Sequence, residues 1–140
     1  MSRSRWSVVL GLLVLCPLAA ADEYRVVVNP KNPAVAVERA ELARLFMKRV
    51  SAWSDGTPVT VVDQERTAPV RVAFSKEVHK KDADAVAAQW ATLVYSGRDV
   101  PPSVKRSDDE VLEFVRQTPG AVGYVSMNPP LSGVKVLALR

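Results

Sequence analysis

Residues 63–69 (DQERTAP) hold the side chains best suited to chemistry in this sequence. They follow an apolar, β-branched run and open a helical pattern, and the start of a helix offers unpaired N–H groups with about half a positive charge. Arg66 adds a guanidinium, which suits phosphate or carboxylate, and the side chains of Gln64 and Thr67 can donate further hydrogen bonds. The pattern predicts an oxyanion-binding site formed by Gln64, Arg66, Thr67 and Ala68.

The same segment also fits an ordinary connection between a strand and a helix. In that interpretation Thr67 only caps the helix and Arg66 is solvated, while the acidic residues Asp63 and Glu65 complement the helix dipole. Such junctions are common, and two acidic residues beside the site weaken it for a trianionic ligand. The residues alone leave both interpretations open.

The rest of the sequence shows no set of residues that builds an enzyme active site. His79 is the single histidine, and it has no second histidine or cysteine beside it. We therefore expect it on the surface at a helix C-terminus, and not as a base or metal ligand. Asp108 to Glu110 fit the first turn of a helix better than a cation site, and Trp53 and Trp90 fit the core better than a pocket. We expect no catalytic residues, no cofactor and no metal.

The first 21 residues have the layout of a secretory signal peptide. Arg3 and Arg5 give a positive start, residues 8–16 form an apolar run, and Ala19 and Ala21 form a small-x-small cleavage pattern. The apolar stretch is shorter than the roughly 20 residues needed to span a bilayer. We expect cleavage at this point and export, to the periplasm if the source is Gram-negative.

The mature domain would comprise residues 22–140. The whole chain has 19 basic and 15 acidic residues, and losing Arg3 and Arg5 leaves a net charge of +2. With no long basic run, this charge predicts no nucleic-acid binding. The single cysteine, Cys16, lies in the predicted signal, so thiol catalysis, thiol–metal sites and disulfides are excluded for the mature domain.

Hydrophobic periodicity predicts strands that alternate with helices. Strands are expected at residues 24–29, 59–62, 121–125 and 134–138. Helices are expected at residues 38–47, from the Thr67-Ala68-Pro69 start to about His79, at residues 82–95, and after a capping box of Ser107 and Glu110. This order favours a single α/β domain with a mostly parallel (mixed) sheet flanked by helices.

Each predicted helix carries an apolar face that should pack on the sheet. The residues expected to face inward are Leu42, Leu45, Phe46, Val70, Phe74, Val78, Val86, Trp90, Leu93, Val94, Val111, Leu112, Phe114 and Val115. Residues 54–58 (SDGTP) form a predicted turn, because Asp and Gly tolerate left-handed geometry and Pro stops a helix.

Four segments of the chain carry a resemblance through their order and spacing: residues 26–33 (VVVNPKNP), 41–46 (ELARLF), 53–59 (WSDGTPV) and 118–125 (TPGAVGYV). Together they resemble the phosphate ABC transporter substrate-binding proteins of the periplasmic solute-binding superfamily. That family shows a valine-rich strand with Asn-Pro, a helix ending in Phe, a W-x-D-G-x-P-like turn and a late P-G-A-I-G-Y-like strand. The resemblance covers nearly all of residues 22–140, and it implies a single periplasmic-binding-protein-like lobe of the class that binds phosphate for ABC import.

The departures from that family matter for the site. A full binding protein of this class holds its ligand between two lobes, whereas this chain is long enough for one and resembles the second. Met47 follows Phe46 where the family usually has Gly. The family's phosphate loop reads like R-x-D-x-S-G-T, and residues 63–68 occupy that place without the Ser-Gly pair. The resemblance therefore carries over only Thr67 and Arg66, and half a cleft leaves an oxyanion exposed to water, where charged contacts weaken.

Two functions follow from the sequence. The first is an exported solute-binding-like protein that binds phosphate or a similar oxyanion at the helix start, linked to ABC-type phosphate uptake or sensing, with a homodimer as one way to complete the cleft. The second is an interaction module that keeps the lobe fold, binds no ligand and docks on a membrane sensor or transporter. The second predicts an exposed apolar patch where the missing lobe would sit. An enzyme is a third reading, without a visible acid, base or nucleophile set.

Overall fold

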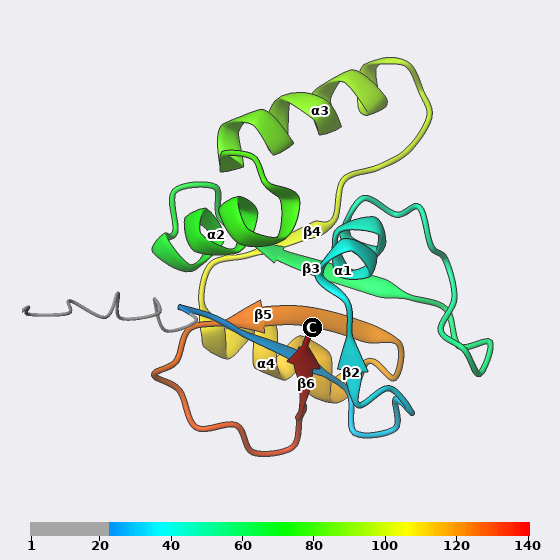
Figure 1. Cartoon of the computed structure of the whole chain (residues 1–140), viewed down its shortest axis with the longest axis vertical. Coiled ribbons are helices and arrows are strands. Elements are labelled where there is room, and N and C mark those ends of the chain that lie inside the picture. Colours follow the sequence, from blue (N-terminus) through cyan, green and yellow to red (C-terminus); the bar gives the residue numbers. More distant parts are fainter. Residues whose placement is uncertain (1–22) are drawn as a thin grey trace, which may run out of the picture.

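A six-stranded sheet organises residues 23–140, which are the residues described in this computed structural model (Figure 1). The strands lie in the order β2-β6-β1-β5-β3-β4. Their bounds are Arg25–Val28 (β1), Ala36–Val37 (β2), Thr60–Gln64 (β3), Ser103–Lys105 (β4), Ala121–Val125 (β5) and Lys135–Leu139 (β6). The pairs β2–β6, β3–β4 and β3–β5 are parallel, and β1 is antiparallel to β5 and β6. The expected α/β fold with a mixed sheet is confirmed.

The central strand β1 is buried on both faces, as its valine run predicts. Val27 and Val28 have no exposed surface, and Val26 has almost none. The expectation that such a strand lies among parallel neighbours is wrong here, because β1 runs antiparallel to both strands beside it. Burial on both faces selects the continuous apolar run, whatever the direction of the neighbouring strands.

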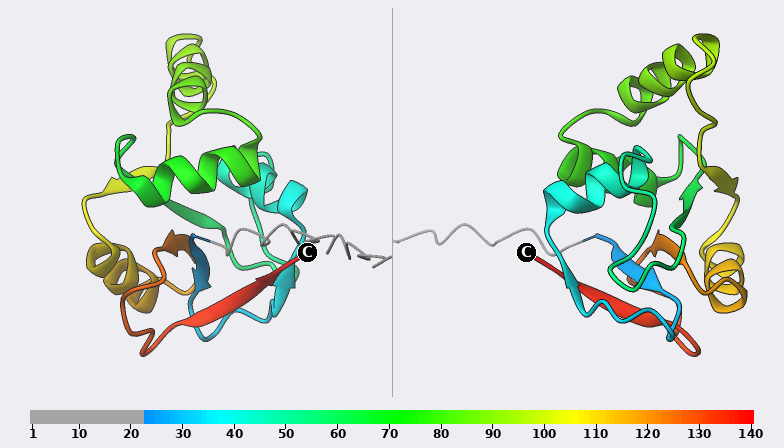
Figure 2. Two further views of the ribbon diagram at one scale, coloured as in Figure 1. Left: turned by 60° about the vertical axis from the view of Figure 1, so that its left-hand side comes forward. Right: turned by 90° about the vertical axis from the view of Figure 1, so that its right-hand side faces the viewer.

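Helices cover both faces of this sheet (Figure 2). One core cluster joins the sheet to α1 (Arg39–Phe46), α2 (Pro69–Phe74) and the π-helix η1 (Ser75–His79), and a second cluster joins its other face to α4 (Asp108–Gln117). The buried residues of these helices are Leu42, Leu45, Phe46, Val70, Arg71, Phe74, Ser75, Val78, Val111, Leu112 and Val115. Apart from Arg71 and Ser75, these are residues that the sequence places inward.

The helix α3 (Ala83–Tyr95) projects from the body of the fold (Figure 1). Its first half packs through Ala83, Val86 and Trp90, which are buried. Val94 is 47% exposed, so the expectation that it faces inward is wrong. The helical periodicity is correct, but the last turn of α3 extends past the sheet and α2 (Figure 2), so its apolar side faces solvent.

Two of the segments that carry the family resemblance meet in space. The indole Nε1 of Trp53, which precedes the turn at residues 54–58, donates to the Gly120 carbonyl oxygen at 3.0 Å. A Cβ at Gly120 would lie 1.8 Å from the Pro58 carbonyl oxygen, so only glycine fits there. Gly56 closes the turn with a φ of 87°. The turn and the start of β5 therefore depend on each other.

The sequence misplaces some boundaries. The strand predicted to end at Val62 continues through Gln64, and the short edge strands β2 and β4 are missed because two or three residues show no period. Ser107 caps α4 as predicted, accepting from the Glu110 N–H at 3.2 Å. No helix within residues 23–140 is long and apolar enough to cross a membrane. The predicted signal peptide lies outside the described residues.

Candidate functional site

The sequence places Gln64 in the connection after β3, but in the structure this residue is part of the strand. Gln64 is the last residue of β3 and is 3% exposed. Its side-chain Nε2 donates to the Tyr124 carbonyl oxygen at 3.0 Å and to Asp108 Oδ1 at 2.8 Å. Both N–H groups of this amide are therefore used within the protein. Gln64 acts as a fixed cross-link between β3, β5 and the start of α4.

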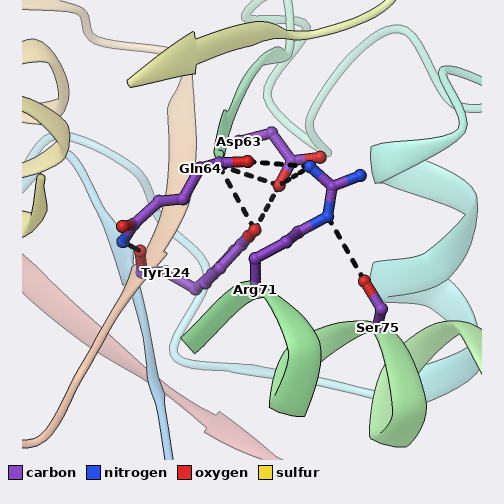
Figure 3. Close-up of polar contacts among 5 residues, drawn as sticks. All are labelled: Asp63, Gln64, Arg71, Ser75 and Tyr124. Carbon is purple, nitrogen blue, oxygen red and sulfur yellow. Dashed lines mark hydrogen bonds and ion pairs between the residues drawn. The ribbon is translucent and has the colours of Figure 1, made fainter. Parts of the chain in front are cut away.

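Asp63, the residue before Gln64, forms a buried ion pair with Arg71 of α2. Arg71 Nη1 lies 3.0 Å from Asp63 Oδ1, and both side chains are 7% exposed. Arg71 also donates from Nη1 to the Gln64 carbonyl oxygen at 2.8 Å and from Nε to Ser75 Oγ at 3.3 Å (Figure 3). Asp63 further accepts hydrogen bonds from the Tyr124 hydroxyl and the Gln64 backbone N–H. We call Asp63, Gln64, Arg71, Ser75 and Tyr124 the buried network.

Burial sets the electrostatics of this network. It raises the pKa of the Asp63 carboxyl, while the Arg71 guanidinium and the Tyr124 hydroxyl act in the opposite direction. Burial, with the nearby Asp63 carboxyl, raises the pKa of Tyr124 as well, so this phenol stays protonated and donates. The charges of Asp63 and Arg71 offset each other, and the pair adds little net charge to its surroundings.

One nitrogen of the buried guanidinium is left open. Arg71 Nη2 has no hydrogen-bond partner among residues 23–140, although the residue as a whole is 6% exposed. Figure 3 shows this nitrogen pointing away from the other four residues of the network. Arg71 and Asp63 both line a pocket of about 440 Å³. The two N–H groups of Nη2 thus have no partner within the described part of the chain.

We call this cavity the α3 pocket, because α3 forms one wall. The polar lining is Asp63, Arg66 and Arg71. The apolar lining from α3 is Ala87, Trp90, Ala91 and Val94. The segment that leads from α3 through β4 adds Pro101, Pro102 and Val104. The lining therefore combines three charged side chains with a larger number of apolar residues. Trp90, expected from sequence to belong to the core, is buried and also borders this pocket.

The other predicted site residues lie in different surroundings. Arg66 borders the α3 pocket, and its Nε lies 3.2 Å from Asp84 Oδ1 in an exposed ion pair. Thr67 is exposed and does not cap the helix, because α2 begins at Pro69 with Ala68 as its N-cap and no side-chain cap bond. The Ala68 N–H donates to the Glu65 carbonyl oxygen at 2.9 Å. Gln64 thus belongs to the buried network and Arg66 borders the pocket, whereas Gln64, Thr67 and Ala68 are not part of the pocket lining.

The carboxylate of Asp108 accepts hydrogen bonds from residues at the carboxyl ends of β3 and β5. Besides Gln64, it accepts from the Ser126 hydroxyl at 2.5 Å and from the Ser126 backbone N–H at 3.2 Å. These donors at the carboxyl ends of the strands, where α/β folds usually bind ligands, are satisfied by the protein's own carboxylate. Within residues 23–140, no three His, Cys, Asp or Glu side chains gather as a metal site.

His79 ends η1 and is half-buried, not fully on the surface as expected. Its ring lies edge-on to Phe74 and Phe46, with centroids 5.7 and 6.5 Å apart. Burial, together with the positive charges of Arg71 and Lys81, lowers the pKa of His79 from 6.5 to about 4. The folded state therefore keeps this imidazole neutral at neutral pH.

We expect the free energy of unfolding to fall as the pH falls from 6.5 toward 4, since the unfolded chain protonates His79 before the folded chain does. From about pH 7.5 to about pH 5.5 the loss should be about 1 kcal/mol. Urea unfolding at several pH values measures this loss. His79→Gln should remove the part of the pH dependence of the unfolding free energy that comes from the imidazole. An unchanged slope in the variant would contradict the depressed pKa.

The sequence interpretation missed the central member of the site, Arg71. A signal was present: on a helix with Val70, Phe74 and Val78 inward, residue 71 lies beside that face and residue 75 lies one turn further on the same side. An arginine and a serine on a buried face imply a buried partner for the charge. Which carboxylate provides it could not be read from the sequence.

Comparison with known proteins finds likeness in structure alone. No known protein family and no curated protein matches the chain. The fold is similar to an ABC-type phosphate transport receptor from Vibrio cholerae (TM-score 0.67, 19% identity), covering 84% of this chain and 46% of that one. It is also similar to a protein from Clostridium perfringens solved with bound phosphate, with a TM-score of 0.66 and 16% identity over 84% of this chain and 45% of that one. A third similar structure is PstS from Borrelia burgdorferi, with a TM-score of 0.59 and 14% identity over 85% of this chain and 47% of that one.

The chain thus spans less than half the length of these solved structures. At this level of identity the likeness shows the fold. The matched share of each neighbour fits the single-lobe form that the sequence resemblance implies, and the neighbours' names describe transport receptors and substrate-binding proteins.

Proposed function

We propose that this chain is a solute-binding lobe that binds phosphate or a similar oxyanion at the α3 pocket. The observation that carries the proposal is Arg71, which is buried, is held by three contacts, lines the pocket and has no partner at Nη2 among residues 23–140. A guanidinium fixed in this way needs no reordering to bind an oxyanion. Similarity to structures described as a phosphate transport receptor and as a phosphate ABC transporter substrate-binding protein with bound phosphate supports the same class of ligand.

The predicted site residues have separate roles in this proposal. Arg66 contacts the ligand at the mouth of the pocket, and Gln64 holds Arg71 through its carbonyl oxygen at 2.8 Å. Thr67 binds through its hydroxyl once a ligand bridges from the pocket to the start of α2, and Ala68 forms that start with its N–H already bonded to the Glu65 carbonyl oxygen. Because Asp63 offsets the charge of Arg71, the lobe alone should bind weakly, with a Kd on the order of 1 mM.

We expect Arg66→Ala to weaken phosphate binding at least about fivefold, since it removes the one cation at the mouth that is not buried in the network. Arg44→Ala is the matched control: Arg44 is 58% exposed and paired with Glu41 at 3.0 Å, and Arg66 is 59% exposed and paired with Asp84 at 3.2 Å. Calorimetric titration with phosphate, and with sulfate for comparison, gives the constants. Equal effects of the two variants would contradict a site at Arg66. Thr67→Ala should weaken binding less, because Thr67 lies outside the pocket lining.

We also propose that the protein acts outside the cytoplasm, in the periplasm of a Gram-negative cell, where it serves ABC-type uptake or sensing. The support is the signal-peptide pattern of residues 1–21 and the neighbours' description as transport receptors. The intact mass of protein recovered from the periplasm tests it. The expected mass is that of residues 22–140, and a full-length mass in the cytoplasm would contradict it.

A second candidate is the interaction module that binds no ligand. Large apolar side chains are exposed at the end of α3 and along the segment after it, namely Val94, Tyr95, Val100 and Val104. Such a patch is what a docking surface for a transporter, a sensor or a second copy would need. Saturable binding of phosphate that Arg66→Ala weakens favours the solute-binding lobe. No heat with any anion at millimolar concentration, with Tyr95→Ser abolishing co-purification with a membrane transporter, favours the module.

A further inference from the structure

We infer that the α3 pocket takes a monocarboxylate that carries an apolar body, rather than a bare inorganic ion. The inference rests on the proposed function, because it names the class of oxyanion that binds at Arg71. It comes from three properties of the pocket that concern its walls, its charge and its open donors.

The walls of the pocket are apolar wherever a ligand would extend away from Arg71. Trp90 and Val94 from α3 line the pocket together with Pro102 and Val104 from the segment that leads into and forms β4. The polar members, Asp63, Arg66 and Arg71, all come from β3, α2 and their connection. A bare ion would leave these apolar walls in contact with water, whereas an apolar body covers them.

The charge of the pocket suits one negative charge. Asp63 neutralises Arg71 at 3.0 Å, and Arg66 shares its charge with Asp84 at 3.2 Å. Arg66 is the cation of the lining that lies outside the buried ion pair, and it can balance one negative charge. A dianion would bring a second negative charge close to the buried Asp63 carboxylate. A monocarboxylate adds a single charge, which Arg66 at the mouth can offset.

The open donors and the volume agree with this class of ligand. Arg71 lines the pocket, and its Nη2 carries two N–H groups without a partner among residues 23–140, which suits one carboxylate better than a phosphate with its larger number of oxygens. The volume of about 440 Å³ lies in the range of sites for small organic ligands and exceeds what one inorganic ion fills. A carboxylate at Arg71 with an alkyl or aryl body along Trp90 occupies both parts of the pocket.

Calorimetric titration of the protein purified from cells that express the full chain tests the inference. The probes are hexanoate, acetate, hexanamide and inorganic phosphate. Each buried methylene is worth about fourfold in affinity. We therefore expect hexanoate to bind at least about tenfold more tightly than acetate or phosphate, and hexanamide, which lacks the charge, to bind at least about tenfold more weakly than hexanoate.

A double variant separates the walls from the anion contact. Val94→Ser with Val104→Ser removes two exposed apolar walls, and we expect hexanoate to lose about tenfold in affinity while acetate loses none. The control is Val35→Ser with Val136→Ser, two exposed valines outside the pocket, one of them also in a strand. It should leave both affinities unchanged.

The outcomes distinguish this inference from the proposed function. Phosphate that binds as tightly as hexanoate or more tightly, with loss in Arg66→Ala, overturns the inference and leaves the oxyanion lobe standing. Hexanamide that binds as well as hexanoate overturns both, because no anion is then recognised. No binding of any probe at millimolar concentration also overturns both. Tighter binding of hexanoate than of acetate and phosphate, lost in Val94→Ser with Val104→Ser but kept in the control variant, supports the inference and the proposed function.

Discussion

Replacing Arg71 by methionine is expected to lower the free energy of unfolding by about 3–5 kcal/mol. The substitution keeps a long apolar stem but leaves the Asp63 carboxylate, 5% exposed, without its cation. It also removes the donors to the Gln64 carbonyl oxygen and to Ser75 Oγ. An uncompensated buried charge is among the most costly changes a core can suffer, because burial takes water away from it.

Urea unfolding measures this loss, and two further variants identify its cause. Arg44→Met removes an exposed arginine from a surface ion pair and should cost less than about 1 kcal/mol. Asp63→Asn combined with Arg71→Met removes both charges while Asn keeps an oxygen for the Tyr124 hydroxyl, so it should recover most of the loss. A double variant as unstable as Arg71→Met alone would show that shape, and not charge, holds the network.

Replacing Phe74 by alanine is the second large effect we expect, a loss of about 3–5 kcal/mol. Phe74 is fully buried, and its ring stacks on Tyr124 with centroids 3.9 Å apart and planes 7° from parallel. It also meets Phe46 at 4.8 Å and Tyr24 at 5.4 Å. The substitution therefore opens a cavity and frees the ring whose hydroxyl donates to Asp63.

The control for Phe74 lies two residues earlier on the same helix. Val72 is 36% exposed, and Val72→Ala should cost less than about 0.5 kcal/mol. Chemical denaturation followed by tryptophan fluorescence compares the two variants. Similar small losses for both would contradict the placement of Phe74 at the centre of the core. Phe74→Leu, which leaves a smaller cavity, provides a graded value if the alanine variant does not fold.

The elements of this fold were largely predictable because their burial is regular. The continuous valine run at residues 26–28 predicts a strand that is buried on both faces, and the spacing of Leu42, Leu45 and Phe46 matches the period of a helix. The structure confirms both. Val94 fits the same helical period yet is exposed. Periodicity shows which side of a helix is apolar, but not where the body of the protein ends.

The candidate site was only half predictable for a related reason. Arg66 and Gln64 could be named because they lie in one segment between a strand and a helix. Arg71 and Tyr124 could not, since their roles depend on β5 lying next to β3 and on the side of α2 that faces Asp63. Those pairings are set by strand order and helix packing, which no local pattern encodes.

The most direct test of the central claim is nuclear magnetic resonance of the arginine Nε–H groups during titration with phosphate and with hexanoate. Arg71 Nε–H is buried and bonded to Ser75, so its signal reports on the guanidinium that carries the proposed site. We predict that this signal shifts saturably with an oxyanion, together with the signal of Arg66, while that of Arg44 stays in place. A stationary Arg71 signal throughout both titrations would contradict oxyanion binding at the α3 pocket.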